Sequence, residues 1–305
     1  MAIEAKTHDS FVTTTRGLRM DILPMLLWER AKKLGIWNPT DFDFTQDTED
    51  WKALSQKQKD YTLTLASQFI SGEEAVTLDL LPLIKVVSEQ GHLEEAMYLT
   101  NFLWEEAKHV DFFSKALAAY GVPAQGLEEY QPPSYRELFY ETFPRRMHAL
   151  YDDPSPANVV RASATYSLGI EGILAETGYF MWYSIMDTNK ILPGTREGIR
   201  HIQLDESRHM AYGVFLLSRL IAEDESLFEI VEEVMDEMLE YLGRTNAETE
   251  ERIGEIPFDF DYEQVMAFGT VQYERRMARI SKARGKTLEE IYRSGKAQLE
   301  DDDAE

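Results

Sequence analysis

The chain has 305 residues and a formal net charge of −24, from 31 Lys and Arg against 55 Asp and Glu. This charge argues against binding to nucleic acids or to anionic membranes, because its field repels phosphate. The hydrophobic fraction of 44% is enough for a large core and excludes disorder of the whole chain. The chain has no Cys, which excludes thiolate catalysis, disulfides, iron–sulfur clusters and cysteine zinc sites.

We see no secretory signal at the start of the sequence. The N-terminus lacks a basic start followed by an apolar stretch. No run reaches the roughly 18 apolar residues that a membrane span needs. We therefore expect no transmembrane segment and a cytoplasmic location.

Long stretches of helical periodicity predict an all-α fold, because alternating β-rich runs are nearly absent. In chain order, helices are predicted over residues 18–34, 55–90, 92–120, 134–150, 154–187, 194–222, 225–248 and 260–283. Pro82 should kink or divide the second of these helices. The stretches 35–54 and 121–133 are predicted to be connections.

Neither connection is a polar linker of the kind that separates domains. We therefore expect residues 1–285 to form a single helical domain. Residues 286–305 are expected to form an acidic C-terminal tail that is partly disordered.

Two Glu-x-x-His motifs stand out, at Glu106-Ala-Lys-His109 and Glu206-Ser-Arg-His209. This spacing places a carboxylate and an imidazole on one helical face, so both can reach one metal ion. Each motif follows a predicted helix that carries a single glutamate on its apolar stripe. The six residues are Glu73, Glu106, His109, Glu171, Glu206 and His209. Their repeated order predicts a pseudo-twofold, ferritin-like four-helix bundle with additional helices.

All six residues lie on stripes that face the predicted core. Four buried carboxylates would repel one another and lose their hydration, unless protons, cationic partners or metal ions compensate. Four carboxylates and two neutral imidazoles match two divalent cations both in charge and in the number of ligands. Iron or manganese suits these ligands better than zinc, magnesium or calcium, and the arrangement is typical of di-iron and di-manganese bundle proteins. The alternative is a set of ordinary polar residues at the edge of a bundle.

At these residues the sequence resembles the small subunit of class I ribonucleotide reductase. It more closely resembles the related ligand-binding oxidases that assemble a mixed manganese–iron site. The segments that carry the resemblance are 71–79, 105–110, 166–176 and 204–209, together with Trp37-Asn38-Pro39 and Phe42-Asp43-Phe44. The similarity spans roughly residues 20–280.

The resemblance implies one metal ion on Glu73, Glu106 and His109 and a second on Glu171, Glu206 and His209, with Glu106 or Glu206 able to bridge. It implies one manganese and one iron per chain, with a di-iron pair as the alternative. The function it implies is an oxidoreductase that activates O2 for two-electron oxidation of C–H bonds. It also implies an internal Tyr166–Val76 ether crosslink, a long-chain fatty acid bound at the metals, and a homodimer.

Three further residues are candidates for supporting roles. Asp205 could accept a hydrogen bond from the non-ligating nitrogen of His109, with a surface salt bridge as the alternative. By the same resemblance, Trp37 would meet this aspartate. Tyr179, two turns after Glu171, is a candidate lining residue of the pocket.

Two other functions stay open at this point. The first is a radical-generating small subunit of class I ribonucleotide reductase. Such subunits typically carry a Tyr four residues after the first ligand His, where this chain has Phe113, and many have Asp in place of Glu73. The second is iron storage or a metal-free structural bundle.

Overall fold

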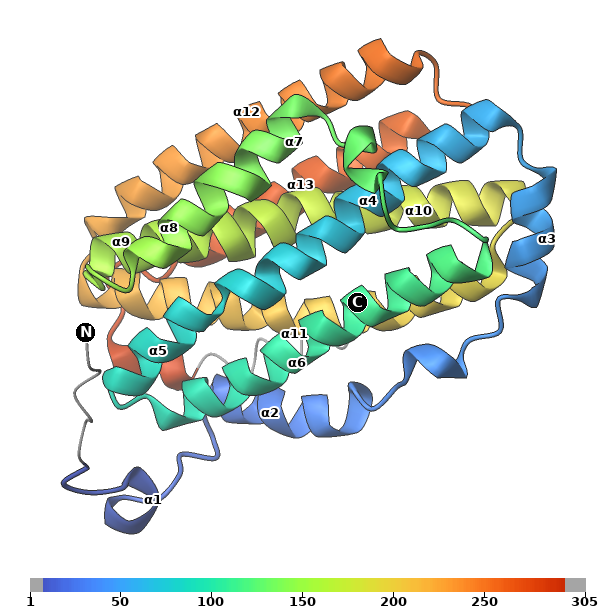
Figure 1. Cartoon of the computed structure of the whole chain (residues 1–305). Coiled ribbons are helices and arrows are strands. Elements are labelled where there is room, and N and C mark those ends of the chain that lie inside the picture. Colours follow the sequence, from blue (N-terminus) through green and yellow to red (C-terminus); the bar gives the residue numbers. More distant parts are fainter. Residues whose placement is uncertain (1–7, 294–305) are drawn as a thin grey trace.

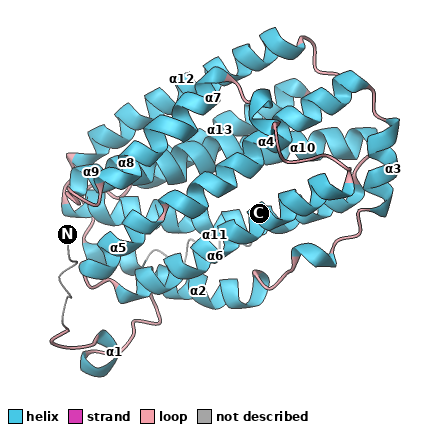
Figure 2. Ribbon diagram, viewed as in Figure 1, coloured by secondary structure: helices cyan, strands magenta, loops and turns pink. Residues whose placement is uncertain are grey.

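The computed structural model describes residues 8–293, which are all-α and contain no β-strand (Figures 1 and 2). Four long helical rods form the centre of the molecule. They are α4 (Gln56–Asp79), α6 (Leu93–Ala119), the continuous run α9–η4–α10 (Pro156–Ser163, Ala164–Ala175, Glu176–Asn189) and α11 (Pro193–Glu223). Helix α6 packs on α4 and α11, and η4 packs on α11. The predicted ferritin-like bundle core is therefore present.

Further helices surround this bundle. They are α1 (Val12–Thr15), α2 (Leu23–Leu34), η1 (Pro39–Asp41), α3 (Thr45–Ala53), α5 (Leu81–Glu89), η2 (Leu127–Tyr130), α7 (Pro133–Glu137), η3 (Leu138–Thr142), α8 (Phe143–Ala149), α12 (Leu227–Ile253) and α13 (Tyr262–Ser281). Helix α2 covers α6, while α12 and α13 pack on η4. Within residues 8–293 no helix is both long enough and apolar enough to cross a membrane.

The predicted break at Pro82 is confirmed, because α4 ends at Asp79 and α5 begins at Leu81. The predicted helices 134–150 and 154–187 each form, but each contains a π-helical segment, η3 and η4 respectively. The spacing of apolar residues does not separate a π-helix from an α-helix over so few turns. Sequence periodicity therefore located these rods without revealing their local winding.

The prediction that residues 35–54 are only a connection is wrong in its second half, where α3 forms. Helix α3 has a weak apolar stripe, and its stability comes from tertiary contacts. Asp47 is buried and accepts hydrogen bonds from the backbone N–H groups of Gly194 and Thr195, at 2.8 and 2.7 Å. Trp51, also buried, stacks on Tyr120. These partners lie far away in the sequence.

The packed part of the chain extends beyond residue 285. Residues 288–293 are helical, and Ile291 is buried in the hydrophobic core. The acidic residues 294–305, for which we predicted partial disorder, lie outside the described residues.

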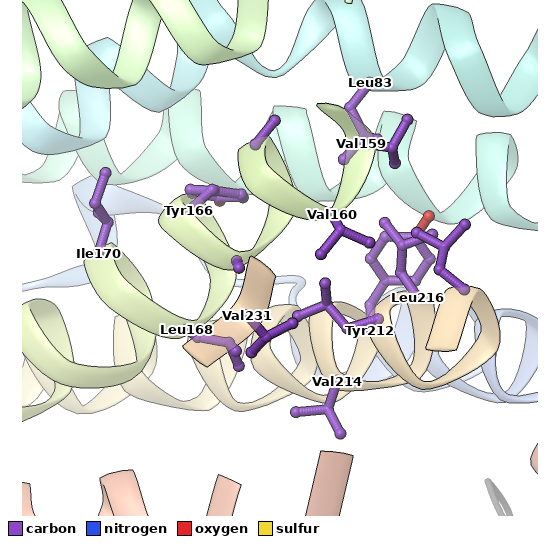
Figure 3. Close-up of a cluster of buried hydrophobic side chains, with 14 of the residues drawn as sticks. Leu83, Val159, Val160, Tyr166, Leu168, Ile170, Tyr212, Val214, Leu216 and Val231 are labelled. Carbon is purple, nitrogen blue, oxygen red and sulfur yellow. The ribbon is translucent and has the colours of Figure 1, made fainter. Parts of the chain in front are cut away.

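The core consists of two hydrophobic clusters. One contains Val76, Phe102 and Ala211 and is shown in part in Figure 3. The other contains Ala66, Phe112 and Ile202. Along α4, α6 and α11, the predicted metal ligands fall between the two clusters. The polar centre is therefore enclosed by apolar packing at both ends.

Close packing between α6 and α11 depends on Gly198. A Cβ atom at this position would lie 1.9 Å from Cε2 of Phe112. We expect Gly198→Ala to lower the free energy of unfolding by about 1–3 kcal/mol, because the core is already filled. The matched control is Gly243→Ala in α12, where a Cβ would meet nothing within 4 Å. That change should raise stability by about 0.5–1 kcal/mol through helix propensity. Chemical denaturation of both variants checks this, and equal effects would contradict it.

Candidate metal centre

All six predicted ligands come together in the middle of the bundle. Their oxygen and nitrogen atoms form two groups, in each of which the atoms lie within 4.8 Å of one another. The first group is Glu73, Glu106, His109 and Glu206, and the second is Glu106, Glu171, Glu206 and His209. Glu106 and Glu206 belong to both groups, so each is placed to bridge two ions. All six side chains are buried.

Four rods supply these side chains. Helices α6 and α11 each contribute a Glu-x-x-His pair, whose members face the same side because they are one turn apart. Helix α4 contributes Glu73, and the π-helical segment η4 contributes Glu171. The internal repeat read from the sequence is therefore a repeat in space.

Both imidazoles present one nitrogen to the carboxylates and the other to an acid behind them. His109 Nδ1 lies 3.2 Å from Glu73 and 3.3 Å from Glu206, while its Nε2 lies 3.3 Å from Asp205. His209 Nδ1 lies 2.8 Å from Glu106. A histidine that binds a metal ion normally donates its other N–H in this way, which fixes the tautomer and the ring orientation.

The second histidine is held by Glu105. His209 Nε2 lies 2.9 Å from Glu105 Oε2, and the carboxylate is fully buried. Burial alone would favour the protonated acid, but the hydrogen bond and charge of His209, with Arg208, lower the pKa of Glu105. The structure assigns Glu105 to His209, as it assigns Asp205 to His109.

Two buried cations, together with Asp205 and Glu105, form an outer ring around the six ligands. Sequence reasoning missed the role of these cations. The Lys108 ammonium lies 2.7 Å from Asp205, and Arg208 lies 2.6 Å from Glu105 and also contacts Asp205. The signal was present in the motifs, because each has an acid directly before its ligand Glu and a cation directly before its ligand His. The repeat thus covers four positions, and each outer acid serves the other motif's histidine.

The six predicted ligands form the inner ring of the centre, and their electrostatics favour the binding of cations. Burial, followed by the charge of Glu206, raises the pKa of Glu106 and of Glu171 well above the usual range. Glu171 Oε2 and His209 Nδ1 are buried and make no hydrogen bond within the described part of the chain. Oxygen-rich ligands with one imidazole per group suit iron or manganese. The residues present therefore fit two divalent ions of this kind.

The remaining predicted residues surround the same centre. Trp37 Nε1 donates to Asp205 Oδ2 at 2.9 Å, and Asp205 is buried, which excludes the alternative of a surface salt bridge. The Tyr179 hydroxyl donates to Glu73 Oε1 at 2.9 Å. The Tyr166 hydroxyl donates to Glu171, and lies 3.4 Å from Glu106. The centre is thus bordered by two buried tyrosines, one on each half.

A cavity of about 130 Å³ opens from the carboxylates towards α12 and α13. Val76 and Tyr179 line its inner end next to Glu73, and its walls are mainly apolar, including Phe69, Phe139 and Leu174. The few polar side chains of the lining include Gln68 and Asn246. Apolar walls with a few polar groups are typical of a small-molecule site, and this one lies beside the carboxylates.

The comparisons with known proteins agree with this geometry. A family model of the ribonucleotide reductase small chain matches residues 26–268. Among solved structures, an R2-like ligand-binding oxidase with a metal cofactor reconstituted aerobically and examined after photoconversion is 35% identical, with a TM-score of 0.85. The match covers 90% of this chain and 99% of that chain.

Further structures of such oxidases give the same result. A tyrosine-to-phenylalanine mutant with an anaerobically reconstituted Mn/Fe cofactor is 36% identical over the same shares of both chains, with a TM-score of 0.85. A structure with an aerobically reconstituted Mn/Fe cofactor after a long soak is 35% identical. The chain therefore belongs to the ribonucleotide reductase small-chain family and, within it, to the R2-like ligand-binding oxidases.

Proposed function

We propose that this chain is a dinuclear Mn/Fe oxidase, an oxidoreductase that uses O2 to oxidise C–H bonds by two electrons. The observation that carries this proposal is the convergence of six buried ligands in a chain whose structural relatives hold a Mn/Fe cofactor. Glu73, Glu106 and His109 would hold the first ion, manganese. Glu171, Glu206 and His209 would hold the second, iron, and a di-iron pair would use the same ligands.

When bound, the metal pair supplies the electrons that reduce O2 and the oxidising power for the C–H bond. The chain's own residues set the conditions for this chemistry. The four carboxylates neutralise the ions, Asp205 and Glu105 hold the imidazoles, and the apolar cavity keeps water away from the reacting bond. A polar group that entered the cavity would meet the metals at its inner end.

Val76 and Tyr166 are the internal C–H bond and phenol that we propose to react. Val76 lies one turn after Glu73 on α4 and lines the cavity, and the Tyr166 hydroxyl faces Glu171. The step breaks the phenolic O–H bond and one C–H bond of Val76 and forms an O–C ether bond. The two protons and two electrons released go to O2, so the chain loses two hydrogen atoms.

The ligand that we propose is a long-chain fatty acid. Its acyl chain would contact the apolar wall formed by side chains such as Leu138, Ile170 and Met266. Its carboxylate would reach the metals, because an anion would be repelled by the four glutamates without them. The family resemblance also leads us to propose a homodimer, and the cytoplasmic location stays a prediction.

The oxidase is favoured over the radical-generating subunit by Glu73, where many of those subunits have Asp, taken together with Phe113. The ring of Phe113 is buried between Phe69 and Phe112, with centroids 5.7 and 5.4 Å away, and it has no hydroxyl to store a radical. Ribonucleotide reduction on addition of a purified class I large subunit would support the other function instead.

Loading the protein anaerobically with Mn²⁺ and Fe²⁺ and then admitting air tests the main proposal. We expect two metal ions per chain, consumption of O2, and a covalent link between the peptides that contain Val76 and Tyr166. Metal analysis, an oxygen electrode and peptide mass spectrometry measure these. Tyr166→Phe is the control, which should keep both metals and lose the link. Unlinked peptides after complete oxidation of the wild-type chain would refute the crosslink.

The outer acids should control the metal sites separately. Glu105→Gln should weaken the site that contains His209 by about 10- to 100-fold, because the imidazole loses the carboxylate that orients it. Asp205→Asn should do the same to the site of His109. Anaerobic Fe²⁺ titration against a competing chelator measures both affinities, with the exposed Glu74→Gln as control. Unchanged affinities in folded variants would contradict the assignment of these acids.

Filling the cavity should expel the fatty acid and leave the metals in place. We expect about one long-chain fatty acid per wild-type chain in solvent extracts. We expect none in Leu174→Trp, because the indole is larger than the leucine side chain and fills part of the cavity. Leu239→Trp is the matched control, since Leu239 is 38% exposed and does not line the cavity. Mass spectrometry of the extracts decides, and a wild-type protein free of fatty acid would contradict this part of the proposal.

A further inference from the structure

A line of aromatic rings leads away from His209 along the boundary between α6 and α11. The ring of Phe102 stacks on His209, with centroids 3.5 Å apart. Tyr98 follows at 6.1 Å from Phe102, and Tyr212 at 5.3 Å from Tyr98. The line is continuous because Tyr98 and Phe102 lie one turn apart on α6, and His209 and Tyr212 one turn apart on α11.

The same line continues to the surface of the molecule. Phe215 lies 6.3 Å from Tyr212, and Tyr292 lies 5.9 Å from Phe215. Tyr292 is half-buried, and the guanidinium of Arg19 lies 4.4 Å from its ring centre. A set of short ring-to-ring steps therefore connects the metal centre with solvent.

Tyr212 differs from the other rings because its hydroxyl has a buried base. It donates a hydrogen bond to Glu95 Oε2 at 3.0 Å, and Glu95 is held by Arg219 at 3.2 Å. Figure 3 shows the ring of Tyr212 among aliphatic side chains such as Val160 and Leu216. By contrast, the buried hydroxyl of Tyr98 makes no hydrogen bond within the described part of the chain.

This difference decides which tyrosine can hold a stable radical. A phenol that loses an electron becomes a strong acid, so a stable neutral radical needs a base that takes the proton at once. Burial, with the charge of Glu95, raises the pKa of Tyr212 well above its usual range, so the resting side chain is the protonated phenol. Tyr98 can pass an electron on but has no hydrogen-bonded base to accept its proton. Tyr212 can also pass an electron on, and its hydroxyl has such a base in Glu95.

We propose that Tyr212 is a redox-active tyrosine that donates an electron to the oxidised metal centre through Tyr98, Phe102 and His209. This inference rests on the proposed oxidase function. The O–H bond of Tyr212 breaks, the electron reduces the metal centre by one equivalent, and the proton goes to Glu95. A one-electron reductant such as ascorbate, acting at Tyr292, returns the electron to the tyrosyl radical, and Glu95 returns the proton.

The opposite side of the centre is less suited to this role. Trp37 also approaches His109, with stacked rings 6.1 Å apart. However, the Lys108 ammonium lies 4.0 Å from the Trp37 ring centre and 4.8 Å from that of Trp104. A fixed positive charge binds to the electron-rich face of an indole and opposes the removal of an electron from it. Within residues 8–293 no cation lies over the ring of Tyr98 or Tyr212, and the guanidinium of Arg19 lies over Tyr292 only at the outer end of the line.

Electron paramagnetic resonance of rapidly frozen samples tests the proposal. The starting protein is Tyr166→Phe loaded with Mn²⁺ and Fe²⁺. This variant lacks the phenol needed for the crosslink, so crosslink formation does not consume the oxidising equivalents. After mixing with O2 we expect a tyrosyl signal that narrows when the protein contains ring-deuterated tyrosine. The signal should be lost when Tyr212→Phe is added to this variant, and ascorbate should quench it.

The matched control is Tyr241→Phe, since the Tyr241 hydroxyl also donates to a glutamate, Glu137, at 3.1 Å, but its ring is not part of the line. That change should leave the signal intact. Glu95→Gln keeps Tyr212 and a hydrogen-bond acceptor but removes the base, so it should also abolish the signal. It therefore tests the same route if Tyr212→Phe does not fold, which circular dichroism and metal content will show.

Oxygen uptake and metal content are measured in the same samples. Uptake of O2 with no tyrosyl signal, or a signal that survives both Tyr212→Phe and Glu95→Gln, would overturn the role of Tyr212 and leave the oxidase function standing. Absence of O2 uptake with two metals bound would refute the oxidase function, and the role of Tyr212 with it.

Discussion

The burial of four carboxylates around two imidazoles is the constraint on which this structure depends. Each buried, unpaired carboxylate would cost several kcal/mol, and apolar packing offers nothing in return. Protons can relieve the repulsion, as the raised pKa values of Glu106 and Glu171 indicate, but divalent ions relieve it with more charge and with bonds to each ligand. The two apolar clusters then serve as walls that hold four rods in place around a polar centre.

The outer ring of the centre shows how the chain holds the buried ligands in place. Glu105 and Asp205 orient the imidazoles of the opposite motifs, and Arg208 and Lys108 neutralise those acids. Each of these four residues is adjacent in sequence to a ligand. An insertion or deletion of one residue between a ligand and its neighbour would therefore disturb both shells of the centre at once.

Much of the fold and of the inner ring could be predicted because both follow from helical spacing. The periodic stretches, the break at Pro82 and the two Glu-x-x-His pairs are local properties of the chain. Helix α3 was missed because its stability comes from hydrogen bonds between Asp47 and the backbone at the start of α11, and no local pattern reports such a contact. Likewise, the pairing of Tyr212 with Glu95 spans more than a hundred residues and appears only once α6 and α11 are side by side.

The near-equivalence of the two halves has a consequence for how unlike ions could be sorted. Both halves present the same kinds of donor atom, one imidazole nitrogen and several carboxylate oxygens, so the general order of divalent affinities ranks competing ions alike on each side. Selectivity must then arise behind the ligands. There the halves differ, with Tyr179 on Glu73 and Lys108 on one side, and Tyr166 on Glu171 and Arg208 on the other. A swap of these supporting groups, with every ligand unchanged, would be the way to invert the preference.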